Sequence, residues 1–207
     1  MNRRLFATTL AAALAAGPAL ADHHSGDHSD KQQTRDFDAS LAEALAFGNQ
    51  AEIAVSELAK DRVQTPQVRD FAQTMVQEHT KVLNRLEEFA PELTDIRRVS
   101  VESGDNPTAS AKNKNAHSSM EQIWTEAAAR CLNKTLEGMK AEQGLDFDWA
   151  YVNQQCFAHT KMLSELEAMR GQGSEEFNQI VEDAVAATKK HKQKLDSLMT
   201  ILERREG

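Results

Sequence analysis

The stretch VRDFAQTMVQEHTKVLNRLEEFA, residues 68–90, indicates the fold class, because its apolar residues recur with helical spacing. Counted with His79, the stripe keeps steps of three or four residues, and its apolar members are Val68, Phe71, Met75, Val82, Leu86 and Phe89. A polar ring therefore lies on the face that an amphipathic helix buries. One such histidine is ordinarily a core residue bonded to a carbonyl, and it indicates a site only if other helices repeat the pattern.

Three other stretches repeat it. The first helix, expected to begin at Asp36 or Asp38, has Glu52 where an apolar residue is expected. The third core helix, near residues 146–170, has His159 in its apolar stripe, and the last helix has His191. Each predicted core helix thus carries one polar residue near the middle of its buried face.

Helix-start signals divide these four helices into two pairs. Thr65 followed by Pro66 is a strong start for the second helix, and Ser174 followed by two glutamates starts the last. Turns near residues 62 and 172 therefore predict two antiparallel hairpins. The long connection between them, residues 91–145, is polar and contains a further predicted helix. We expect an all-α, antiparallel four-helix bundle with a long crossover connection that carries an extra helix.

Composition agrees with a helical globular domain. The 207 residues are 40% hydrophobic and only 5% aromatic, with few Pro and Gly. The sequence has 24 basic and 32 acidic residues, so its net charge is -8, and it contains no basic cluster with interleaved aromatics. Nucleic acid is therefore not an expected partner.

The first 21 residues are typical of a secretory signal peptide. Arg3 and Arg4 precede an Ala/Leu-rich run that is too short for a membrane anchor, and Ala19-Leu20-Ala21 offers a cleavage point. We expect a periplasmic protein, exported by the general or the twin-arginine route, whose mature chain has no transmembrane segment. Residues 22–35 read as a disordered, His-rich leader, and residues 36–206 as the bundle.

Cleavage after Ala21 would leave the new terminus Asp22-His23-His24. A free amine, two ionisable amides and an imidazole at the third residue can surround Cu(II) or Ni(II) in a square plane. We therefore predict an N-terminal copper site at Asp22, His23 and His24. The alternative is that these histidines only make the leader polar.

Glu52, His79, His159 and His191 are expected to share one layer of the core. At about 1.5 Å rise per residue, the first two lie about 15 and 20 Å from their turn, and the last two about 18 and 25 Å from theirs. An unsatisfied buried polar group costs about 1 to 3 kcal/mol, so a shared metal site for Zn, Cu or Fe is favoured over four separate residues. The alternative is a polar layer that only fixes helix register.

Two further residues lie on the face of His159. Tyr151 and Gln155 precede it by eight and four residues, so they are expected to orient the ligands; the alternative is that both bond water at a helix seam. Di-iron chemistry is not favoured, because Val76 and Thr188 stand where its additional glutamates would be.

The chain has two cysteines, Cys131 and Cys156. Both lie on predicted apolar faces and the expected compartment is oxidising, which predicts a disulfide between the crossover helix and the third core helix. The alternative is two buried thiols that never meet.

Three motifs carry a resemblance to a known family. GNQAEIAVSELA, VRDFAQTMVQEHT and FDWAYVNQQCFAHTKML, followed by a late histidine, resemble the bacterial ferritin-like proteins catalogued as domain of unknown function 4142, often labelled predicted outer-membrane proteins. The resemblance covers about residues 36–90 and 144–205. It implies a ferritin-like bundle in the envelope, outer-membrane association as an alternative to a free periplasmic protein, and no established activity.

Two classes of function remain open. The first is a periplasmic metal-binding bundle that uses Glu52 and the three histidines. The second is a non-enzymatic envelope interaction or stress protein that binds an envelope partner or a second copy of itself. No Ser/His/Asp set or phosphate loop is recognisable, so no catalytic residue is predicted and catalysis is the least favoured interpretation.

Overall fold

The computed structural model describes residues 28–93, 95–96 and 119–206, and within these residues it contains five α-helices and no strand. The helices are α1 (His28–Arg62), α2 (Pro66–Leu86), α4 (Ser119–Ala141), α5 (Gly144–Met169) and α6 (Glu175–Glu206). The all-α prediction is confirmed. The predicted signal peptide, Asp22, His23, His24 and residues 97–118 of the crossover lie outside the described residues. Among the described helices, none combines the length and apolar character needed to cross a membrane.

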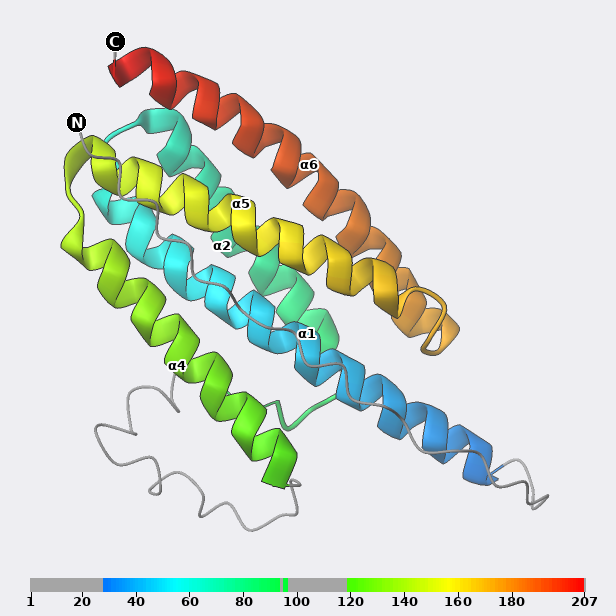
Figure 1. Ribbon diagram of the computed structural model, residues 1–207. Helices are drawn as coiled ribbons and strands as arrows, with labels where there is room; N and C mark the ends of the chain where they lie inside the picture. The colour runs from blue at the N-terminus through cyan, green and yellow to red at the C-terminus, as the bar shows by residue number, and fades with distance from the viewer. Residues whose placement is uncertain (1–27, 94, 97–118, 207) are drawn as a thin grey trace.

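Helices α1, α2, α5 and α6 surround a common core, and α4 lies along the outside of α1 (Figure 1). The α1–α2 turn, the start of α5 and the end of α6 meet at one end of the molecule, where Asp148 bonds the turn and Arg205 bonds Thr65. At the other end, Asp38 of α1 bonds Ser174 before α6. The two helices that each short turn joins, α1 with α2 and α5 with α6, are therefore antiparallel, while α2 and α5 run in the same direction.

Both predicted helix starts are confirmed, but their chemistry differs. The Ser174 hydroxyl accepts the N–H of Phe177 at 3.2 Å, as an N-cap does. Thr65 makes no such bond, and its hydroxyl accepts a bond from the side chain of Arg205. The carboxylate of Asp148 instead accepts the N–H groups of Gln64 and Thr65 at 2.8 and 2.7 Å. A residue of α5 thus fixes the turn between α1 and α2.

Helix α1 begins earlier than expected. It starts at His28 rather than at Asp36 or Asp38, so residues 28–35 are helical although we expected a disordered leader there. Its first turns project beyond the other helices (Figure 1), and residues 30–37 are exposed. Bonds between residues four apart, such as Gln32 to Asp36, support this segment. Asp38 is buried and accepts the N–H of Ser174 at 3.0 Å.

The apolar core is divided by a polar layer. One cluster, which includes Phe71, Tyr151 and Leu198, fills the end where α5 begins. The second, which includes Leu45, Leu166 and Phe177, fills the opposite end. Between them lie the buried polar residues Asn49, Glu52, His79, His159 and His191.

The predicted disulfide is wrong, because Cys131 and Cys156 are free thiols. Helix α4 packs mainly on α1 and buries Ala129, Leu132 and Met139, which leaves Cys131 exposed. The thiol of Cys156 points to α6, where it lies 4.0 Å from the sulfur of Met199. The apolar face on which we expected Cys131 is therefore not the buried face of α4, and the two cysteines do not face each other.

Candidate metal centre

Three buried histidines from three helices meet in the polar layer. His79 of α2, His159 of α5 and His191 of α6 each offer one ring nitrogen, and these nitrogens lie within 4.8 Å of one another. The ring centroids are 5.1 to 5.9 Å apart. The structure therefore brings together the three histidines that the helical spacing predicts for one layer.

The orientation of His79 is fixed by α1. Its Nδ1 lies 2.8 Å from Oδ1 of Asn49, whose amide NH₂ donates to the carbonyl of Leu45 at 2.8 Å. An amide oxygen only accepts, so Nδ1 of His79 carries the hydrogen. Its Nε2 is then a bare lone pair, and this buried atom has no hydrogen-bond partner among the described residues.

Oxygen atoms fix the other two rings in the same way. Nδ1 of His159 donates to the carbonyl of Gln155 at 3.0 Å, and Nε2 of His191 lies 2.7 Å from a carboxylate oxygen of Glu78. Both oxygens accept, which assigns the hydrogen to the nitrogen that faces each of them. In all three histidines the nitrogen bonded to oxygen carries hydrogen, and the remaining nitrogen is free to act as a ligand.

This assignment gives the contact between His159 and His191 a specific meaning. Nε2 of His159 and Nδ1 of His191 are 3.1 Å apart. Two bare lone pairs at that distance repel each other unless a cation, either a proton or a metal ion, lies between them. Two nitrogens bound tetrahedrally to one ion at about 2.1 Å are about 3.4 Å apart, so the spacing fits shared coordination.

The surroundings keep two of the imidazoles neutral. Burial, together with the neighbouring His159 and His191, lowers the pKa of His79 well below its usual range. Burial and then His191 lower the pKa of His159 to about 4. Phe71 contributes to this apolar setting, because its ring lies 6.4 Å from His159 and 6.3 Å from His191. Neutral imidazole is the form that binds a metal ion.

Glu52 lies in the same polar layer but is not a member of the histidine group. Its Oε2 accepts a bond from the side-chain amide of Gln155 at 2.6 Å, and burial raises the pKa of Glu52 to about 7. Gln155 therefore contacts both predicted kinds of ligand, because its backbone oxygen bonds His159 and its side chain bonds Glu52. The hydroxyl of Tyr151 bonds Ser56 at 2.9 Å instead of a histidine.

Two supporting residues were not predicted from the sequence. Asn49 precedes Glu52 by three residues, so helical spacing places both on neighbouring parts of one face of α1. Glu78 directly precedes His79 in the chain, yet it bonds His191 of another helix. The position of Asn49 could have indicated its role, whereas the partner of Glu78 depends on how α2 packs against α6.

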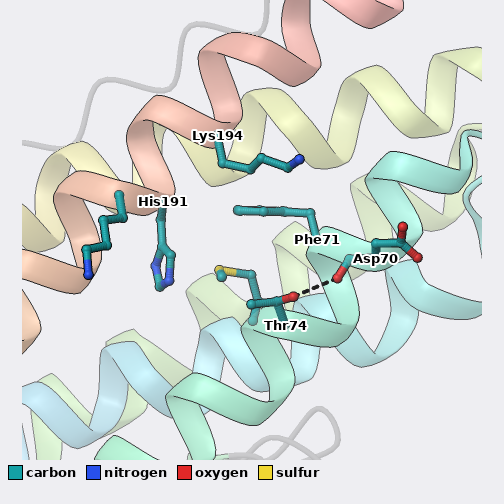
Figure 2. A pocket seen from close by; sticks show the side chains of 7 residues that line it. Asp70, Phe71, Thr74, His191 and Lys194 are labelled. Atoms are coloured by element: carbon teal, nitrogen blue, oxygen red, sulfur yellow. Dashed lines mark hydrogen bonds between the residues drawn. The ribbon is translucent and has the colours of Figure 1, made fainter.

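A surface pocket of about 340 Å³ between α2 and α6 reaches this centre. Figure 2 shows the Phe71 ring directed toward His191 across the pocket, with Lys194 on the α6 side and Asp70 and Thr74 on α2. Met75 and Lys190 complete the lining. One of the three histidines thus forms part of a pocket wall.

Comparison with known proteins gives a match to a protein family. The model of a family described as a domain of unknown function (DUF4142) matches residues 23–198. No curated protein and no solved structure matches the chain.

Proposed function

The chain belongs to the DUF4142 family, and from its geometry we propose that it binds one divalent transition metal ion through His79, His159 and His191. The observation that carries this proposal is that one ring nitrogen from each of the three histidines lies within 4.8 Å of the other two. By the hydrogen positions given above, one nitrogen of each ring also lacks a hydrogen. A bridging proton can satisfy two of them, whereas a metal ion can satisfy all three.

The donor set defines which ions suit the centre. Three neutral imidazoles favour Zn, Cu or Fe over Mg or Ca, which prefer oxygen ligands. Three protein ligands also leave a fourth position for water or another ligand, as in catalytic rather than structural zinc sites. Asn49, the carbonyl of Gln155 and Glu78 would serve as the outer partners that orient metal-bound histidines.

A polar layer that only fixes helix register is the competing interpretation. Such a layer gains nothing from unpaired atoms, because a buried polar atom without a partner costs about 1 to 3 kcal/mol. The unpartnered Nε2 of His79 and the close nitrogen pair of His159 and His191 are therefore better explained by a metal ion.

We further propose that the four core helices form a ferritin-like bundle. Two antiparallel hairpins joined by one long crossover, with the ligands projecting inward from the middle of the helices, support this arrangement. The crossover returns along the outside of α1 by way of α4 (Figure 1).

Metal titration of the full chain tests the function. We expect chelator-stripped protein to bind one Co(II) ion with an absorption spectrum typical of tetrahedral nitrogen coordination, and Zn(II) to displace it. His79→Ala should lose this spectrum because one of the three ligands is removed. Asn49→Ala, which retains all three ligands, should bind about 10 to 100 times more weakly because His79 loses its orienting bond.

Gln50→Ala provides a matched control for Asn49→Ala. Gln50 is a neighbouring buried amide whose Oε1 accepts the N–H of Ile96 instead of a histidine hydrogen. We expect this variant to lose stability and keep the Co(II) affinity. Stripped protein that binds neither ion, or a His79→Ala variant that binds as tightly as the parent chain, would exclude the proposed centre.

The location of the protein is a separate proposal. We propose export to the periplasm through the leader of residues 1–21, on the strength of its arginines, its apolar run and its small-residue cleavage point. N-terminal sequencing of protein from the periplasmic fraction should give Asp22 as the first residue. If that holds, Cu(II) binding that is lost in His24→Ala would support the terminal copper site, and any other terminus would remove its basis.

A further inference from the structure

A pocket between α2 and α6 reaches the histidine centre from the surface at His191. His191 lines it and is 8% exposed, while His79 is 4% and His159 0% exposed. Phe71 and Met75 form apolar walls against the core, and both are almost completely buried. A small molecule from solvent therefore meets the centre first at His191.

Size and charge restrict what this pocket accepts. A volume of about 340 Å³ is at the lower end of small-ligand pockets. Lys190 and Lys194 of α6 border it with exposed ammonium groups, whereas Asp70 is the one acidic residue of the lining (Figure 2). Within the lining the lysines exceed the acid by one charge, and beside it the carboxylate of Glu78 bonds His191 at 2.7 Å. The two lysines therefore supply the attraction for an anion at the mouth, and the bound metal ion supplies it inside.

Coordination chemistry gives such an anion a place to bind. Three imidazoles leave an ion of Zn(II) or Co(II) short of its usual four ligands. Because neutral imidazoles bring no negative charge, the bound ion keeps its full positive charge and attracts an anionic fourth ligand.

We propose that this pocket is a binding site for a small anion, a carboxylate or an inorganic anion, that enters between α2 and α6 and completes the coordination of the metal ion. The inference rests on the proposed metal centre and adds a ligand class and an entry route to it. His191 is both a metal ligand and part of the pocket wall. Lys190 and Lys194 attract the anion, and Phe71 and Met75 exclude bulk water from the path.

Azide titration of the Co(II)-loaded full chain tests this proposal, because azide is a small anion and the Co(II) spectrum reports a change of the fourth ligand. We expect a saturable spectral change in the parent protein. Replacing both lysines, Lys190→Ala with Lys194→Ala, should weaken azide binding about three- to tenfold, because exposed charges contribute modestly. Thr74→Trp should fill the pocket and abolish the azide response while the azide-free Co(II) spectrum is retained.

Lys189→Ala is the matched control, since Lys189 is adjacent on α6 but its ammonium lies 3.5 Å from Glu167 of α5 and does not line the pocket. Its azide affinity should remain within twofold of the parent value. The anion site is overturned, and the metal centre is left intact, by either of two results. One is a Co(II) spectrum that does not change when azide is added; the other is an azide affinity that is unchanged from the parent value in both the Thr74→Trp and the double-lysine variants. Failure to bind Co(II) at all would instead overturn the centre on which it depends.

Discussion

The chemistry of the centre depends on where single hydrogen atoms lie. An imidazole can present either nitrogen as a ligand, and the oxygen that accepts from the other nitrogen makes the choice. Here an amide, a backbone carbonyl and a carboxylate make that choice for three rings on three helices. The amide of Asn49 is held in turn by Leu45, so the tautomer of His79 depends on a bond to the backbone of α1.

Glu52 gives this layer a measurable pH dependence. Its pKa is raised from 4.5 to about 7 by burial, so the folded chain without metal holds the proton more tightly than the unfolded chain does. The contribution of this bound proton to the free energy of unfolding is fully present below pH 4.5 and is lost as the pH rises through 7. A shift of this size corresponds to about 3 kcal/mol.

Glu52→Gln removes this titration and keeps an oxygen that can accept the bond from Gln155. In the presence of a chelator, we expect the free energy of unfolding of the variant, relative to the parent chain, to rise by about 3 kcal/mol between pH 4.5 and 8. Urea denaturation at several pH values measures this difference, in which the titration of the histidines cancels. A difference that is independent of pH would contradict a buried, proton-binding Glu52.

The histidines of the centre were predictable because helical spacing alone puts each on a buried stripe. The position of Glu52 outside the group of three histidines was not predictable in the same way, since it depends on the reach of one side chain and on its bond to the amide of Gln155. Sequence periodicity gives the face of a helix on which a residue lies. It does not give the side-chain torsion angles, which decide where the carboxylate of a glutamate points.

At the scale of the helices, one buried carboxylate makes two of the bonds that connect the hairpins. Asp148 of α5 is fully buried and accepts two backbone N–H groups from the turn between α1 and α2. Arg62 donates to the carbonyls of Lys140 and Glu142, which lie just before α5. These bonds hold the start of α5 against the first hairpin.

Replacing Asp148 should therefore destabilise the whole fold. Asp148→Asn keeps the shape but lacks the charge and one of the two acceptor oxygens, so we expect a loss of about 3 kcal/mol in the free energy of unfolding. Asp146→Asn is the control, because Asp146 is exposed in the first turn of the same helix and should cost at most about 1 kcal/mol. Equal losses in the two variants would show that the turn does not depend on the Asp148 carboxylate.

The helices themselves were largely predictable, whereas their ends and the face of α4 were not. Pro66 and Ser174 are local signals, and the helices begin where they indicate. The start of α1 and the buried face of α4 have weaker signals. Cys131 illustrates the difficulty, because we expected it on an apolar face and it is exposed.

At the scale of the whole molecule, the proposed metal ion would join two hairpins. His79 belongs to the α1–α2 hairpin, and His159 and His191 belong to the α5–α6 hairpin. Because the ligands lie in the layer between the two apolar clusters, an ion bound by all three must be released before the hairpins separate. Metal binding is therefore expected to stabilise the fold as a unit.

Hydrogen exchange in the presence and absence of Zn(II) measures this coupling. With free Zn(II) at about a thousand times its dissociation constant, amides that exchange only through global unfolding should slow about a thousandfold, in α1 and α2 as much as in α5 and α6. In His79→Ala two of the three ligands remain, so Zn(II) should bind more weakly and the slowing of exchange at the same free Zn(II) should fall in all four helices. If His79→Ala slowed exchange as much as the parent chain at the same free Zn(II), His79 would not be a ligand, and the ion would not join the two hairpins.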